Sequence, residues 1–310
     1  MNIAMGNTFK ALVKREFWEN KGSMFYTPGI MAAFYAVFLL ILVMFGNAWV
    51  ENGHYNIDLF DHLPKMTAEF DSINEEDRTK VVQMGLYGTS VSFIFVMLII
   101  SLFYCLGSLY DERKDRSILF WKSLPVSDLM TVMSKFVSVT LLIPVCYFIV
   151  ISAFQIYSLI FATVGAWFGG SSGINIWASS NLFGVMFNML FSLITVSLWL
   201  APFWAWLMFA SSWAKKVAFM WGMLPIFLIV FAEGWIFRST YLIEVIGERF
   251  AEAGMILASN VDRLVDGDML DGAGSAWYQV FGNMEFWMGL IVTGVFLAGA
   301  VFTRRFRDES

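Results

Sequence analysis

Side chains that could carry out catalysis or bind a metal are scarce in this sequence. Its two histidines, His54 and His62, lie with Asp58 at four-residue intervals, so on a helix all three would share one face. No cysteine or third histidine accompanies them, and Gly53 and Pro64 bracket the stretch. A solvated acidic loop is therefore favoured over a metal site.

Sequence motifs for catalysis are also missing. The chain has no H-E-x-x-H, no G-x-S-x-G and no phosphate-cradling G-x-x-x-x-G-K-[ST]. Cys105 and Cys146 both lie within apolar runs, where we interpret them as packing residues and not as a disulfide. We expect a chain that is not itself an enzyme, binds no cofactor or metal, and has no nucleic-acid partner.

The composition indicates a membrane protein. Of 310 residues, 58% are hydrophobic and 15% are charged, whereas a soluble domain of this size is about a quarter charged. Six apolar stretches are long enough to cross a bilayer: Gly29–Ala48, Gly85–Tyr110, Phe136–Val164, Leu182–Ser211, Val217–Ile236 and Glu285–Thr303. Pro144, Pro202 and Pro225 predict kinks within three of them. We predict an all-α polytopic integral membrane protein with about six transmembrane helices in one domain.

The distribution of charge predicts the orientation of these spans. With the N-terminus inside, the cytoplasmic side receives 14 of the 20 Lys and Arg residues and 8 of the 25 acids. Because positive charge concentrates on the cytoplasmic side, we expect both termini there, with residues 1–28 forming an amphipathic interfacial helix and residues 111–135 a cytoplasmic loop. Residues 49–84 and 237–284 are then extracytoplasmic, and Tyr241–Leu264 has helical spacing.

The interior of the six spans is nearly free of charge. They contain no Lys, Arg or His, and their only acids, Glu233 and Glu285, lie at outer ends, where we interpret Glu233 as interfacial. Carriers coupled to protons usually need an ionisable group near the midplane. Neutral polar residues are present, and they either line a translocation path or hydrogen-bond between helices. The candidate path residues are Gln155, Asn188, Ser192 and Thr195.

The loop after the second span has the sharpest pattern. A dense charged cluster from Asp111 to Arg116 is followed by the apolar Ile118, Phe120 and Trp121, then by Pro125. Ser127 and Asp128 predict the capped start of the next helix. A short helix with exposed apolar side chains suits a groove on another protein. Alternatively, these residues fold back onto the membrane interface.

These stretches resemble the permease subunit of an ABC-2 type exporter. The resemblance is carried by L-V-K-R-E-F-W at Leu12–Trp18 and by the motif after the second span. The motif residues are Glu112-Arg113, Ser117, Leu119 and Leu124-Pro125-Val126-Ser127. The resemblance implies six spans, an N-terminal interfacial helix and a coupling helix in the second loop. It also implies a complex of two permease subunits, identical or related, with two copies of a P-loop ATPase that hold ATP and Mg²⁺.

The resemblance further implies which residues contact the ATPase. These are Asp111, Glu112, Arg113, Arg116, Phe120 and Trp121, the charged ones pairing with charges on the ATPase surface and an aromatic side chain filling a groove. The implied function is export of an amphipathic or hydrophobic compound across a bacterial inner membrane. A carrier driven by an ion gradient, or a membrane sensor or anchor without transport, are the alternatives.

Overall fold

The computed structural model describes residues 2–50, 59–116, 126–266 and 276–306, and within them every regular element is a helix. Six helical segments of the described chain are long and apolar enough to cross a membrane, and each overlaps one predicted span. They are Gly22–Ile41, Glu75–Lys114, Asp128–Phe168, Ile174–Trp199, Ala218–Phe237 and Met284–Phe306. The chain therefore has the architecture of an all-α polytopic membrane protein.

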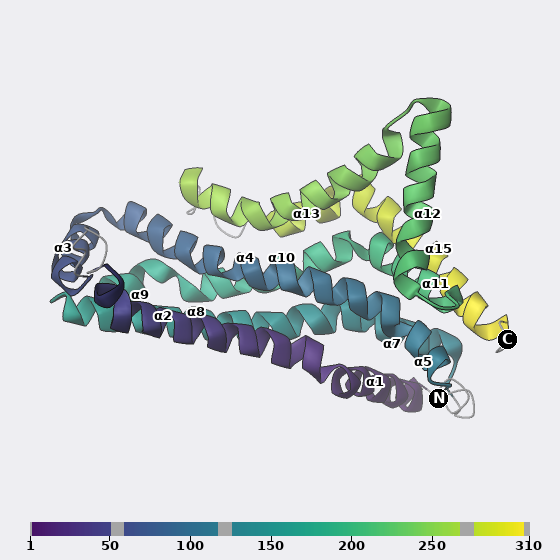
Figure 1. The fold of residues 1–310 in the computed structure, drawn as a ribbon, viewed down its shortest axis with the longest axis horizontal. Helices are drawn as coiled ribbons and strands as arrows, with labels where there is room; N and C mark the ends of the chain where they lie inside the picture. The colour runs from purple at the N-terminus through teal and green to yellow at the C-terminus, as the bar shows by residue number, and fades with distance from the viewer. Residues whose placement is uncertain (1, 51–58, 117–125, 267–275, 307–310) are drawn as a thin grey trace.

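Four long helices run side by side and form the body of the molecule (Figure 1). They are α2 (Thr27–Val50), α4 (Glu75–Ser108), α8 (Ile143–Phe168) and α10 (Leu182–Trp199). Phe93 of α4, Tyr147 of α8 and Leu193 of α10 are fully buried in the core between them. Apolar side chains such as Phe34 of α2 are exposed on the outside, as expected for helices that lie in lipid.

Both chain termini lie at one end of this bundle, which we call the terminal end (Figure 1). The elements there include α1 (Asn2–Glu19), η1 (Gly22–Tyr26), α5 (Tyr110–Lys114) and α7 (Asp128–Val137). The N-terminal segment is helical as predicted, and in α1 Leu12 is buried whereas Lys10 and Lys14 are exposed. Its position at the membrane interface stays a prediction. The opposite end, called the far end, carries α3 (Leu59–Ser72) and α9 (Ile174–Ser180).

Two predicted spans are less regular than the sequence indicates. Residues 182–211 form two helices, α10 and α11 (Ala201–Trp213), separated by a turn at Leu200. Pro202 lies in the first turn of α11, where its missing N–H needs no partner, so the predicted kink is instead a complete break. The third span contains a π-helical turn, η2 (Ser138–Leu142), directly before Pro144, which is a known way to accommodate such a residue.

The fifth span leaves the parallel bundle. In Figure 1, α12 (Ala218–Ala232) crosses the direction of α4 and α8, and α13 (Tyr241–Asp266) returns along α4 and α10. Between them, η3 (Glu233–Phe237) begins with Glu233, which accepts hydrogen bonds from Ser239 Oγ (2.9 Å) and the Leu242 N–H (3.0 Å). Glu233 therefore caps the start of α13, the helix that the spacing of Tyr241–Leu264 predicts.

Two short elements after α13, α14 (Ala276–Gln279) and η5 (Val280–Gly282), lead into the last span. This span, α15 (Met284–Phe306), packs along α11 and reaches α7 at the terminal end. Gly289 of α15 faces the guanidinium of Arg249 on α13 closely enough that a β-carbon there would collide with it. The absence of a side chain at Gly289 thus leaves room for the guanidinium of Arg249 between α13 and α15.

Hydrogen bonds hold α3 against the turn between α8 and α9 at the far end. Asp71 accepts hydrogen bonds from Ser171 Oγ and from Asn175 Nδ2, both at 2.7 Å, and these two bonds lower the pKa of its carboxyl. Gly170 and Gly173 in this turn have positive φ, 82° and 68°, which glycine adopts without steric cost. The polar contacts of Asp71 therefore fix the position of α3.

The predicted face of His54, Asp58 and His62 is only partly within the described chain. His62 is exposed on α3, and the other two lie outside the described residues. Within the residues that the structure describes, no group of three or more His, Cys, Asp or Glu side chains could hold a metal ion.

Replacing Asp71 tests its role at the far end. We expect Asp71→Ala to speed amide hydrogen exchange in residues 59–72 and 171–175 about threefold to tenfold, the factor for a net hydrogen bond of about 1 kcal/mol. Hydrogen exchange with mass spectrometry measures this. Glu69→Ala, an exposed acid on the same helix, is the matched control and should leave these rates unchanged. Equal effects of both substitutions would refute the assignment.

Candidate functional site

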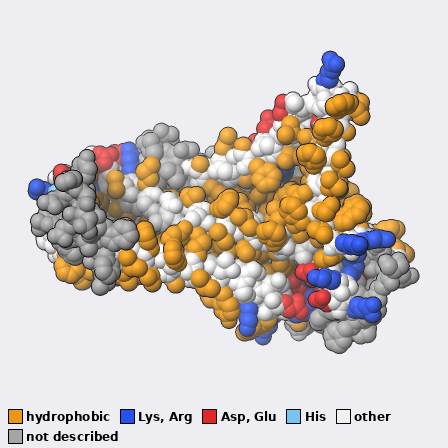
Figure 2. Space-filling model, in the orientation of Figure 1, with side chains coloured by type: hydrophobic (Ala, Val, Ile, Leu, Met, Phe, Trp, Pro, Cys, Tyr) orange, Lys and Arg blue, Asp and Glu red, His pale blue; other side chains and the backbone are white. Residues whose placement is uncertain are grey.

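Charged side chains from four helices meet at the terminal end of the bundle, and we call this group the ion network. Its members are Arg15 and Glu16 of α1, Glu112 of α5, Asp128 and Lys135 of α7, and Arg304 of α15. Figure 2 shows acidic and basic side chains gathered at this end, on the right of the view, and hydrophobic side chains over the middle of the molecule.

Lys135 lies at the centre of the ion network. Its Nζ is 2.9 Å from Glu16 Oε1 and 3.0 Å from Glu112 Oε1, so one ammonium serves two carboxylates. Lys135 is 3% exposed and Glu16 is 1% exposed. The other oxygen of Glu16 accepts a hydrogen bond of 2.9 Å from the hydroxyl of Tyr104 on α4. The centre therefore joins α1, α4, α5 and α7.

Two arginines complete the ion network. Arg304 Nη1 is 2.6 Å from Glu112 Oε2, and its Nε is 3.0 Å from Asp128 Oδ1. Arg15 Nη2 is 2.6 Å from Glu16 Oε1 and 3.1 Å from Glu112 Oε1. Arg15 Nε also lies 3.4 Å from the half-exposed carboxylate of Glu19. The three cations of the ion network thus face its three carboxylates and Glu19 beside them. Because each buried ion loses several kcal/mol of hydration, such a group is stable only when all its charges are paired.

Local sequence explains how these side chains converge. Leu12 and Glu16 are one turn apart on α1 and are both buried against the neighbouring helices. Ser127 Oγ accepts a hydrogen bond from the Met130 N–H (3.3 Å) and caps α7, as predicted. This cap begins the helix at Asp128, which places Asp128 and Lys135 two turns apart on one face.

The segment after α4 is also fastened to the end of α11. Arg113 Nη2 donates to the carbonyl oxygens of Ser211 (2.6 Å) and Ala214 (2.9 Å). The Leu109 N–H donates to Ser211 Oγ (3.3 Å), and the Tyr110 hydroxyl donates to the Lys216 carbonyl. A cation near the last carbonyls of a helix interacts favourably with the helix dipole. Residues 109–113 are therefore held to α11 as well as to the ion network.

The resemblance assigns Glu112 and Arg113 to charge contacts with a partner. In the structure both side chains also bond within the chain, Glu112 to charged groups of α1, α7 and α15 and Arg113 to carbonyl oxygens at the end of α11. Asp111 and Arg116 are exposed. Phe120 and Trp121 lie outside the described residues. The predicted contact of the loop with another protein stays a prediction.

The candidate path residues lie on α8 and α10, among the packed helices. Gln155 is fully buried, and its Nε2 donates to the Leu86 carbonyl and to Ser90 Oγ, both at 3.2 Å. Ser192 and Thr195 are also buried, whereas Asn188 is partly exposed and hydrogen-bonded to Tyr87. The contacts of Gln155 are those of helix packing between α8 and α4, and a translocation path stays a prediction.

Sequence reasoning missed the ion network. It counted Arg15, Lys135 and Arg304 among the cytoplasmic cations, and it predicted no contacts of these residues with Glu16 or Tyr104. The available signal was their position: Lys135 directly precedes a predicted span, Arg304 directly follows one, and Glu16 lies one turn after an apolar residue of α1. A charged side chain at the end of a span either extends into solvent or forms an ion pair with a charged side chain on another helix. The sequence alone does not distinguish these two arrangements.

No protein-family model, no curated protein and no solved structure matches this chain.

Removing the central ammonium tests the ion network. We expect Lys135→Met to lower the free energy of unfolding by about 3 kcal/mol, because it leaves two buried carboxylates facing each other. Chemical denaturation in detergent measures this. Adding Glu16→Gln removes one of these charges and should restore part of the loss.

Lys114→Met, which removes an exposed cation of α5, is the matched control and should be nearly neutral. A loss of stability in Lys135→Met no larger than that in Lys114→Met would contradict the pairing.

Proposed function

We propose that this chain is the permease subunit of an ABC exporter, driven by ATP hydrolysis on a separate subunit. The observation that carries the proposal is the fastening of α5. Glu112 is paired with α1, α7 and α15, and Arg113 is bonded to α11. A partner that displaces the loop after α4 therefore also displaces the ends of α1, α7, α11 and α15, which is the requirement for transmitting motion into a membrane domain.

Residues on the same loop are the proposed contact with the ATPase. Asp111 and Arg116 are exposed, and Phe120 and Trp121 follow within the apolar stretch that suits a groove. In this proposal two copies of the P-loop subunit bind ATP and Mg²⁺, and a second permease, identical or related, completes the complex. The charge-poor apolar spans support an amphipathic or hydrophobic substrate, because no buried counter-ion would be needed.

The proposed setting is a bacterial inner membrane with both termini in the cytoplasm. The position of the ion network supports this orientation, because it lies at the terminal end together with the exposed Lys10, Lys14 and Lys114. Basic residues are enriched on the cytoplasmic side of membrane proteins.

Purification from the native host tests the function. We expect gentle detergent extraction of the tagged chain to recover a near-stoichiometric partner that contains G-x-x-x-x-G-K-[ST], identified by mass spectrometry, and a complex that hydrolyses ATP. A preparation without an ATPase, from cells that express one, would contradict the proposal and favour a carrier or a sensor.

Trp121→Ala tests the docking loop. We expect wild-type membrane insertion but at least about a fivefold lower recovery of the ATPase, since a buried interfacial Trp typically contributes more than 1 kcal/mol. Quantitative mass spectrometry of the purified complex measures the ratio. Trp18→Ala, which removes an exposed indole of α1, is the control. Unchanged recovery and ATPase activity in Trp121→Ala would rule out this contact.

A further inference from the structure

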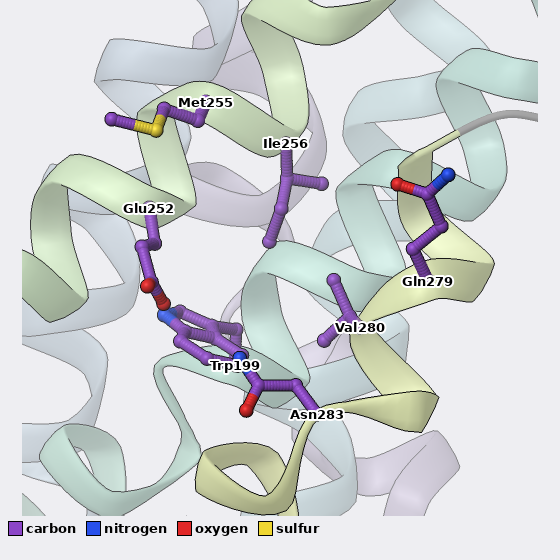
Figure 3. Close-up of a pocket in the computed structure, with 7 residues that line it drawn as sticks. All are labelled: Trp199, Glu252, Met255, Ile256, Gln279, Val280 and Asn283. Atoms are coloured by element: carbon purple, nitrogen blue, oxygen red, sulfur yellow. The ribbon is translucent and has the colours of Figure 1, made fainter.

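A cavity of about 260 Å³ lies between the end of α10, the middle of α13 and the segment that leads into α15. Its lining residues are Trp199, Glu252, Met255, Ile256, Gln279, Val280 and Asn283. Figure 3 shows the carboxylate of Glu252 directed toward the indole of Trp199, with Asn283 beside the same ring. Glu252 and Asn283 thus place polar groups beside Trp199, on one side of a largely apolar pocket.

The apolar side of the pocket has one exposed and two buried residues. Ile256 and Val280 are buried at 6% and 9% exposure, whereas Met255 is 64% exposed and lies at the mouth. Methionine is flexible and adapts to ligands of different shapes. The pocket is therefore lined by two buried apolar side chains, Ile256 and Val280, and by one flexible side chain, Met255, at its opening.

The wall behind Glu252 is held by reciprocal bonds. Trp199 Nε1 donates to the Arg249 carbonyl, and Arg249 Nε donates to the Trp199 carbonyl, both at 2.9 Å. The Arg249 guanidinium lies 4.5 Å from the centre of the Trp199 ring, and the ring of Phe286 stacks with that of Trp199. These contacts join α10, α13 and α15, so the pocket is formed before any ligand binds.

Among the side chains that the structure describes, negative charge predominates around the pocket. Glu252 shares its surroundings with the acids Glu285 and Glu248, and Arg249 is the cation that acts on it. Partial burial, followed by repulsion from Glu285, raises the pKa of Glu252 despite the attraction of Arg249. A positive ligand group beside Glu252 would offset both unfavourable effects, whereas an anion would increase the repulsion.

We propose that this pocket binds a small amphipathic organic cation, with its ammonium group beside Glu252 and its apolar part against Met255, Ile256 and Val280. The volume is slightly below the roughly 300 Å³ at which pockets for drug-sized ligands begin, so a molecule with one ring fits. Asn283 Oδ1 accepts the Glu285 N–H (3.0 Å), which holds the Asn283 amide in place at the polar side. This binding requires no ATPase and is independent of the proposed transport.

Equilibrium binding of benzyltrimethylammonium to the purified, detergent-solubilised chain tests the proposal. We expect saturable binding in isothermal titration calorimetry, and weakening by about tenfold in Glu252→Gln, the factor for about 1.4 kcal/mol. Glu244→Gln removes an exposed acid two turns earlier on α13, outside the pocket lining, and should bind within about twofold of wild type. Thermal unfolding of each variant shows that the fold is kept.

Charge and pocket shape are tested separately. Neopentylbenzene, the neutral isostere, should bind more weakly than the cation and should not respond to Glu252→Gln. Val280→Phe, which fills the pocket, should abolish binding of both compounds. The proposal is overturned if the cation shows no saturable binding at millimolar concentration. It is equally overturned if Glu252→Gln binds the cation like wild type, or if the neutral compound binds as tightly, which would indicate an apolar site for lipid.

Discussion

A buried ammonium shared by two carboxylates constrains the whole terminal end of this molecule. Lys135 can leave neither Glu16 nor Glu112 without stranding a charge away from water, and each such charge costs several kcal/mol. Each of the two carboxylates is also paired with an arginine, Glu16 with Arg15 and Glu112 with Arg304. The ends of α1, α5, α7 and α15 are therefore bound to one another by electrostatics as well as by apolar packing.

The constraint explains why the terminal end and the far end differ. At the far end, α3 is held by neutral donors to the partly exposed carboxylate of Asp71 and by the Thr67 hydroxyl, which donates to the Gly169 carbonyl (3.0 Å), an arrangement that can open at low cost. Between the two ends, helices α4 and α8 are joined by the neutral amide of Gln155. In hydrocarbon a neutral hydrogen bond is far cheaper to rearrange than an ion pair. We therefore expect the terminal end to move as one unit and the helices of the middle to shift more readily.

The regular part of the fold could be predicted from sequence, because it depends on local patterns. Apolar runs of sufficient length predicted six spans, the spacing in Tyr241–Leu264 predicted α13, and Ser127 predicted the start of α7. The break at Leu200 and the course of α12 could not be predicted. Pro202 permits either a kink or a break, and the choice depends on the packing of α11 against α15.

The site was harder to predict because its members come from four separate segments. Glu112 and Arg113 were identified through the loop motif, but their contacts depend on where α1, α7, α11 and α15 end in space. No sequence pattern indicated the pocket at Trp199 and Glu252 either, because amphipathic spacing shows only that α13 has a polar and an apolar face. Resemblance and composition led to a functional proposal, whereas the ion network that supports it became apparent only in three dimensions.

Electron paramagnetic resonance distances between spin labels test the rigid terminal end most directly. Cys105 and Cys146 are first replaced by alanine. One pair of labels, at Lys14 and Lys114, measures the distance between α1 and α5 within the terminal end. A second pair, at Lys65 and Lys114, measures the distance between the far end and the terminal end, and all three positions are exposed. In the purified complex with its ATPase, we predict that ATP leaves the 14–114 distance unchanged and shifts the 65–114 distance. A change in the 14–114 distance with a constant 65–114 distance would contradict the transmission of motion through the ion network.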